Sequence, residues 1–109
     1  MKYEIKRNDT APAIVATLSD EQGTIALTGS TVRFKMAAAP DTGISFTPIN
    51  RTCTILDAPN GIVQFSWLTG DTATAGVYRA EFEVTFANGA VETFPSDQYI
   101  DIIIRSDLG

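Results

Sequence analysis

The sequence contains no histidine and one cysteine, Cys53, among its 109 residues. Without histidine there is no imidazole general base, no Ser-His or Cys-His nucleophile pair and no histidine-ligated metal. A single cysteine cannot form an intramolecular disulfide, the usual staple of a small secreted domain. We therefore expect a chain without a disulfide that is not an enzyme and has no catalytic residue, metal site or cofactor.

Clustered positive charge and long hydrophobic runs are also missing. The chain has 8 Lys and Arg against 13 Asp and Glu, which gives a net charge of -5 at pH 7. A nucleic-acid-binding protein needs grouped basic residues to displace counterions from phosphates, so we expect neither nucleic acid nor an anionic membrane as a partner. No stretch reaches the roughly 20 apolar residues that cross a bilayer. The first residues lack the apolar core of a signal peptide, which predicts synthesis in the cytoplasm.

What the sequence does contain is a strong period of two. Apolar residues alternate with polar ones most clearly over residues 78–86, and similar alternation covers residues 32–36, 63–67 and 100–104. This period is typical of half-buried β-strands. No segment has a convincing helical period.

Turn signals separate the alternating segments. Asn88-Gly89 is a strong hairpin signal, and residues 58–61 form a second turn. We count seven to nine short strands with turns every eight to twelve residues. This pattern predicts an all-β fold, an antiparallel β-sandwich that fills one domain over residues 1–109.

Two acidic motifs invite an enzymatic interpretation. Asp41-Thr42-Gly43 is similar to the triplet of homodimeric retroviral-type proteases, in which two aspartates share one proton. However, Pro40 precedes the triplet here, and we interpret it as a loop turn. Glu81 and Glu83 would lie about 7 Å apart on one strand face, a spacing found in inverting glycosidases. A solvated strand face explains them more simply.

Two further groups have structural interpretations. The oxygen-bearing residues Asp57, Asn60 and Asp71 could meet at one end of a sandwich as a calcium site, but turn and capping roles explain them better. Cys53 lies in an alternating segment, which predicts a buried, unreactive thiol.

The segment that enters the longest strand is similar to the tyrosine corner of immunoglobulin domains. Gly76-Val77-Tyr78 leads into the strand, and Trp67 lies upstream as a core tryptophan. The second cysteine of the immunoglobulin pattern would fall at Ala80, so this is a disulfide-free version. A Tyr78 hydroxyl that bonds back to the preceding turn would fix the corner.

The order of motifs along the whole chain resembles the N-terminal domain of the baseplate upper proteins of tailed bacteriophages, an immunoglobulin-like module. The motifs are Ile5–Pro12, Leu27–Met36, Asn60–Trp67, Asp71–Tyr78, Glu81–Val84 and Thr93–Pro95. This resemblance implies a virion structural protein of the tail or baseplate that mediates protein–protein assembly. Its implied partners are other virion proteins and copies of itself, and its implied location is the virion, after synthesis in the host cytoplasm. The domain that carries receptor binding in this family is not expected within these 109 residues.

Three apolar residues break the alternation and are candidate interface residues. Ile103 faces away from the predicted core, and Ile44 and Phe46 lie in the longest predicted loop. The alternatives to a tail component are an immunoglobulin-like adhesion or carbohydrate-binding module and a capsid-decorating protein.

Overall fold

The computed structural model describes residues 2–40, 42–95 and 98–108, and this part of the chain forms eleven β-strands and no helix. The strands are β1 (Lys2–Lys6), β2 (Ile14–Thr17), β3 (Ser19–Asp20), β4 (Gly23–Thr24), β5 (Thr31–Ala38), β6 (Ile49–Thr52), β7 (Thr54–Asp57), β8 (Ile62–Phe65), β9 (Gly76–Thr85), β10 (Val91–Phe94) and β11 (Ile100–Arg105). No helix in the described residues is therefore long and apolar enough to cross a membrane.

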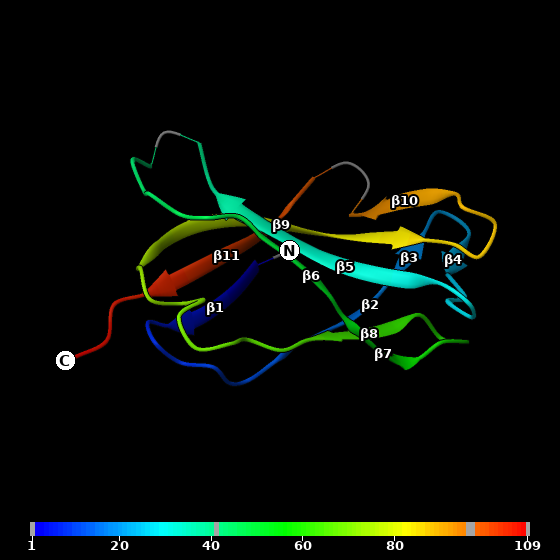
Figure 1. Cartoon of the computed structure of the whole chain (residues 1–109), viewed down its shortest axis with the longest axis horizontal. Coiled ribbons are helices and arrows are strands. Elements are labelled where there is room, and N and C mark those ends of the chain that lie inside the picture. Colours follow the sequence, from blue (N-terminus) through cyan, green and yellow to red (C-terminus); the bar gives the residue numbers. More distant parts are fainter. Residues whose placement is uncertain (1, 41, 96–97, 109) are drawn as a thin grey trace.

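Two sheets form the sandwich. Sheet A has six strands in the order β1-β11-β9-β5-β6, with β10 also paired to β9, and sheet B has three strands in the order β2-β8-β7. Figure 1 shows sheet B along the lower right of the view, below β5 and β9. The strands of these two sheets fall within the predicted seven to nine, and the short β3–β4 hairpin raises the total to eleven. The all-β sandwich without a disulfide is confirmed.

One strand pair departs from the predicted antiparallel arrangement. β1 pairs with β11 in parallel, with Lys2 opposite Asp101 and Lys6 opposite Arg105, while the other pairs are antiparallel. This pair joins the two ends of the chain, and no local turn signal announces such a contact. The two turns predicted from the sequence do form hairpins, β7–β8 and β9–β10.

The strand order is that of an immunoglobulin-like sandwich. In sheet B the immunoglobulin positions B, E and D are taken by β2, β8 and β7. In sheet A the positions G, F, C and C′ are taken by β11, β9, β5 and β6. In immunoglobulin domains strand A normally pairs with B. Here β1 pairs with β11 instead, so the position beside β2 in sheet B has no strand among the described residues.

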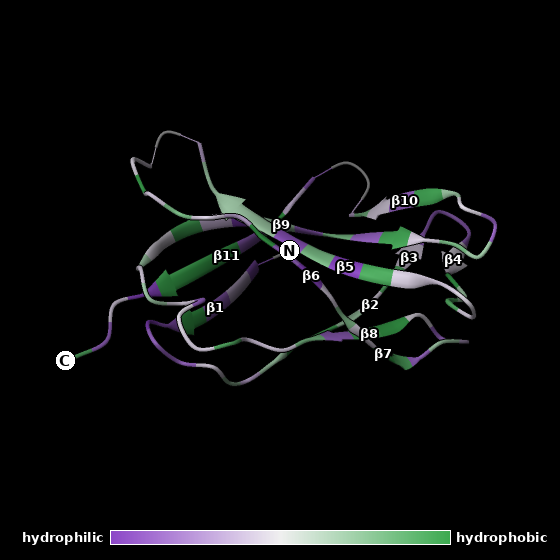
Figure 2. Ribbon diagram, in the orientation of Figure 1, coloured by the Kyte–Doolittle hydropathy of each residue, from purple (hydrophilic) through white to green (hydrophobic). Residues whose placement is uncertain are grey.

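The core is built from the inward-facing residues of the alternating strands. Along β9 and β5 every second side chain is buried, and Figure 2 shows this alternation as green and purple bands along β5. Phe34 from sheet A stacks on Phe65 from sheet B with ring centroids 4.0 Å apart, which joins the two layers. Aromatic pairs of this kind contribute roughly 0.5–1.5 kcal/mol beyond the area that they bury.

A buried threonine fixes the segment that crosses between the sheets. Thr72 is 1% exposed, and its hydroxyl donates to the Asp9 carbonyl over 2.8 Å. The amide of Asn8 donates in turn to the Thr72 carbonyl over 3.0 Å. Residues 7–13, which connect β1 to β2, are therefore tied to the loop before β9.

Candidate assembly surface

Tyr78 lies at the start of β9 and forms a polar contact with the preceding turn. Its side chain is fully buried, and its hydroxyl donates to the Thr74 carbonyl over 2.7 Å. Burial raises the pKa of the Tyr78 hydroxyl, which therefore stays protonated and able to donate. This is the geometry of a tyrosine corner.

Gly76 and Trp67 complete the set of residues that the sequence singled out around this corner. Gly76 has a φ of 154°, and a Cβ built there would lie 2.2 Å from Cδ1 of Ile44. Trp67 is 4% exposed and packs edge-on against Phe65, with ring centroids 5.1 Å apart. The tryptophan follows β8, whereas the core tryptophan of immunoglobulin domains lies on strand C, where this chain has Phe34. All three residues shape the core and present little surface to a partner.

The candidate interface residues Ile44 and Phe46 are half-buried. The ring of Phe46 packs edge-on against Tyr78 with centroids 4.7 Å apart, and Ile44 lies against Gly76. Segment 42–48 therefore folds the side chains of Ile44 and Phe46 onto the inner side of β9. We expected these two side chains to be available to a partner, but the chain itself covers much of their surface.

Ile103, the third candidate, lies on the outer face of sheet A. It is opposite Val77 in the β11–β9 ladder and is half-buried, while Val77 is 42% exposed. The parallel neighbour of Ile103 on β1 is Glu4. The apolar spot formed by Ile103 and Val77 is therefore small and has a charged border.

Charged residues dominate the rest of the outer face of sheet A, and they pair across the strands. Lys35 Nζ lies 2.7 Å from Glu83 Oε2, and Arg33 Nε donates to Asn50 Oδ1 over 2.6 Å. Glu83 is thus held by Lys35, which leaves it poorly placed to act with Glu81 as a glycosidase pair.

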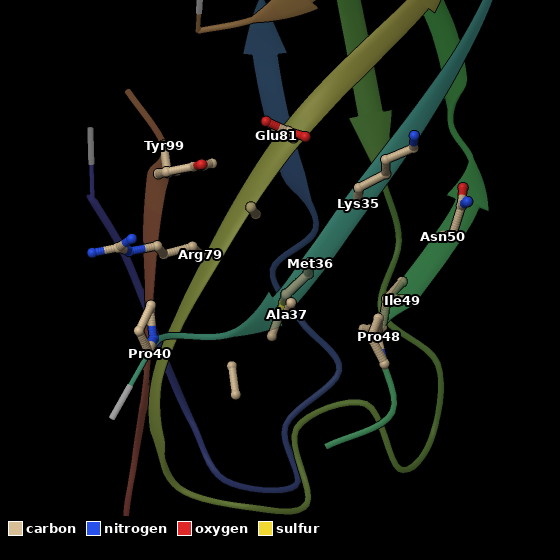
Figure 3. Close-up of a pocket in the computed structure, with 12 residues that line it drawn as sticks. Lys35, Met36, Ala37, Pro40, Pro48, Ile49, Asn50, Arg79, Glu81 and Tyr99 are labelled. Carbon is tan, nitrogen blue, oxygen red and sulfur yellow. The ribbon is translucent and has the colours of Figure 1, made fainter. Parts of the chain in front are cut away.

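A groove of about 360 Å³ opens on this face over β5 and the middle of β9, with Pro40 and Pro48 at its border. Figure 3 shows Arg79 and Tyr99 on one side and Lys35 and Asn50 on the other, with Glu81 on β9 between them. The Arg79 guanidinium lies over the Tyr99 ring, 5.2 Å from its centroid. The groove therefore combines hydrogen-bond donors and acceptors with apolar lining from residues such as Met36, Pro40 and Ile49.

The outer face of sheet B has the opposite character. Val15, Leu56 and Leu68 are 57%, 50% and 57% exposed there. Leu56 projects because it is the extra residue of a bulge between the β7 pairs at Ile55 and Asp57. Thr54, Gln64 and Ser66 share a shallow hollow of about 220 Å³ with Leu68. Arg51, which is paired with Asp71, lines the same hollow and is the charged residue at its border. We call this surface, formed by Val15, Thr54, Leu56, Gln64, Ser66 and Leu68, the sheet B face.

The three strands of sheet B contain almost no charged residues. The one charged residue in β2, β7 and β8 is Asp57, whose carboxylate accepts the amide and the side-chain amide of Asn60 in the β7–β8 turn. This surface has no signal in the sequence, because exposed valine and leucine in an alternating strand cannot be distinguished from core residues by pattern alone.

The sequence matches the model of the BppU N-terminal domain over residues 3–95. The chain belongs to this family. The family is the N-terminal domain of baseplate upper proteins, so the chain is a phage baseplate-related structural protein and a virion component that interacts with other virion proteins. The matched residues run from β1 to the residue after β10, so they include all of sheet B and every strand of sheet A except β11. No curated protein matches the sequence.

The aspartic-protease and calcium-site interpretations of the acidic residues gain little support from the geometry of this baseplate domain. Asp41, the candidate catalytic aspartate, lies outside the described residues. Asp71 accepts the Leu68 amide over 2.7 Å and is paired with Arg51, so its oxygens have structural partners. Among the residues that the structure describes, no group of three acidic, cysteine or histidine residues could hold a metal ion.

Cys53 is 8% exposed, and burial raises the pKa of its thiol to about 12. A thiol with so high a pKa carries almost no thiolate at neutral pH and is a poor nucleophile. The residue behaves as part of the core.

Proposed function

We propose that this baseplate domain is an assembly module of the phage tail, and that it binds other virion proteins and copies of itself through the sheet B face. In this proposal it catalyses no reaction, needs no cofactor and binds neither nucleic acid nor membrane. Its net charge of -5 supports the last point, because DNA and anionic lipids repel such a chain.

The observation that carries the proposal is the contrast between the two outer faces. Sheet A presents paired charges to solvent, whereas the sheet B face presents three exposed apolar side chains among uncharged strand residues, with the Arg51–Asp71 pair at its border. The centres of protein interfaces are depleted in charged residues in the same way. Covering the exposed part of each apolar side chain contributes roughly 1 kcal/mol, and many such contacts in a particle reinforce one another.

A charged substitution on each face tests the proposal. Leu68→Lys should reduce incorporation of a tagged copy into phage particles, whereas Thr31→Lys, which adds the same charge at an exposed position of β5, should not. Both variants should melt within a few degrees of the wild type, because both positions are exposed. Equal incorporation of the two variants would overturn the assignment of the sheet B face.

The candidate interface residues provide a competing location. Ile103→Asp changes the small apolar spot beside Val77 on sheet A and leaves the sheet B face intact. If this variant fails to incorporate while Leu68→Lys incorporates normally, the assembly surface is the apolar spot formed by Ile103 of β11 and Val77 of β9. Phe46→Asp is less informative, because Phe46 packs on Tyr78 and its loss would also destabilise the fold.

A second candidate function is carbohydrate binding, and one residue favours it. Tyr99 is 49% exposed at the rim of the groove on sheet A, beside the polar side chains of Arg79 and Glu81. An exposed aromatic ring among hydrogen-bonding groups is suited to a sugar ring. Saturation-transfer NMR with a panel of host cell-wall oligosaccharides tests this, and loss of the signal in Tyr99→Ala would locate the site.

A further inference from the structure

One side of the sandwich is closed over only half of its length. β1 closes the half beside β11, where it pairs with residues 101–105 and where the Tyr3 hydroxyl donates to the Pro12 carbonyl of the segment leading to β2. Further along, β9 pairs on the same side with β10, and no strand among the described residues lies between β10 and β2. Figure 1 shows β1 and β11 toward the left of the view and β10 at the right.

A slot of about 160 Å³ opens in the half that β1 does not close. Ala16 and Leu18 line it from the sheet B side, and Phe82, Phe94 and Ile100 line it from sheet A. Its lining is mainly apolar, and its volume is comparable to that of an engineered cavity known to hold a benzene molecule. The slot is therefore large enough for one apolar side chain.

The strand that borders the slot has a free edge. Among the described residues β2 has a single strand neighbour, β8. The Leu18 amide donates to the Gly61 carbonyl over 2.8 Å, so it points toward β8. Because backbone groups alternate in direction along an antiparallel strand, the amides and carbonyls of Val15 and Thr17 point away from β8, to the open side.

This edge lacks the usual protection against a further strand. Sheet edges are commonly guarded by charged side chains. The free edge of β1 carries Lys2, Glu4 and Lys6, whereas β2 has the sequence Ile-Val-Ala-Thr and carries no charge.

We propose that an extended segment of another virion protein adds to β2 as a strand of sheet B and inserts one apolar side chain into the slot. The segment takes the position that strand A holds in immunoglobulin domains. It hydrogen-bonds to Val15 and Thr17 and places an uncharged, apolar residue between Ala16 and Phe82. Strand addition of this kind is an established mode of peptide recognition. The inference rests on the proposed function, because it identifies the kind of partner that a virion domain binds.

A second copy of this chain does not fit the same position. Its own β2 would bring inward-facing residues such as Ile14 and Leu18, which are 6% and 3% exposed because they belong to its own core. The inward-facing Ile5 of its β1 edge is likewise 6% exposed. The occupant must be a segment whose side chains are still free on the face that it turns to the slot.

Three variants test the inference in particles assembled with a tagged copy of the chain. Thr17→Pro removes the edge amide of β2 without removing a bond to β8, a position at which edge strands accept proline. Ala16→Leu fills the slot from within. Lys6→Pro is the matched control, because the Arg7 amide points to Arg105 on β11 and the Lys6 amide therefore points away from it.

We expect the wild type and Lys6→Pro to incorporate equally, and Thr17→Pro and Ala16→Leu to incorporate about tenfold less or worse. For Thr17→Pro this corresponds to losing one or two edge hydrogen bonds, and for Ala16→Leu to excluding the inserted side chain from the slot. Hydrogen exchange followed by mass spectrometry gives an independent measurement. The amides of Val15 and Thr17 should exchange slowly in wild-type particles and rapidly in the isolated protein.

The outcomes separate this inference from the proposed function. If the wild-type chain is absent from particles, the proposed function fails and the inference fails with it. If it is present but Val15 and Thr17 exchange equally fast in particles and in isolation, the inference is overturned and the proposed function stands. If these amides are protected in the isolated protein as its mass doubles, a second copy is the occupant and the stated partner is wrong.

Discussion

The hydroxyl of Tyr78 is a single group whose contribution to the stability of the fold can be measured directly. Tyr78→Phe removes the hydrogen-bond donor. The Thr74 carbonyl, which is partly buried, then loses this hydrogen bond. We expect the free energy of unfolding to fall by roughly 1–2 kcal/mol, with the fold retained, as measured by urea denaturation. Tyr3→Phe is the matched control, because its bond to Pro12 is exposed and its loss should cost less than about 1 kcal/mol. Equal losses for both variants would contradict a special role for the corner.

The buried thiol of Cys53 predicts a loss of stability in alkaline solution. Burial raises its pKa from 9.0 to about 12, so the folded state favours the protonated thiol. Its contribution to stability is complete below pH 9, where both states are protonated, and is lost as the pH rises toward 12 because the unfolded state releases its proton first.

Denaturation in urea at several pH values checks this expectation. Between pH 9 and 11 the unfolding free energy of the wild type should fall faster than that of Cys53→Ala, by at most about 1.4 kcal/mol per pH unit. In the native protein at pH 8 the thiol should also resist Ellman's reagent until denaturant is added. Parallel pH profiles for the two proteins would mean that the thiol is accessible in the folded state.

At the scale of the element, a double-mutant cycle can measure how tightly segment 42–48 packs on β9. Gly76→Ala places a Cβ 2.2 Å from Cδ1 of Ile44, which is a steric clash. It also forces a non-glycine residue to adopt a φ of 154°. We expect a loss of about 1–3 kcal/mol. In the Ile44→Ala background the steric part disappears, so the loss from Gly76→Ala should shrink by about 0.5 kcal/mol or more. Strict additivity would show that the loop does not pack tightly on the strand.

The elements also differ in how far the sequence could predict them. The alternation over residues 78–86 and the Asn88-Gly89 turn are local signals, and the β9–β10 hairpin confirms them. The parallel β1–β11 pair has no such signal, because parallel pairing of the two chain ends depends on the register of distant strands. The open half beside β2 follows from that pairing and was invisible for the same reason.

The exposure of individual apolar residues was harder to predict from the sequence than the fold. Ile44 and Phe46 looked exposed because they lie in a loop, yet a long loop can fold back and cover a strand end, as this one does at Tyr78. Val15 and Leu68 lie in or next to alternating strands and are 57% exposed, although the sequence analysis singled out neither residue. Periodicity indicates which side chains share a face, but not which of the two faces is buried when both carry apolar residues.

The whole molecule carries its charge unevenly, and this controls how copies meet. At pH 7 the net charge of -5 keeps copies apart, and near the pI of about 4.4 that repulsion vanishes. We expect light scattering to give the monomer mass of 11.7 kDa at low concentration and pH 7, and a mass that rises with concentration as the pH falls toward 5.

The same titration distinguishes association through the sheet B face from general loss of solubility. Leu68→Lys and Thr31→Lys change the net charge equally, but only the first places a charge on the sheet B face. If copies meet through this face, Leu68→Lys should stay monomeric at a pH where Thr31→Lys and the wild type associate. If both variants associate like the wild type, self-association does not use the sheet B face. A stable ring at pH 7 would mean that the chain carries a stronger interface of its own, since three exposed apolar side chains at roughly 1 kcal/mol each cannot hold one together at low concentration.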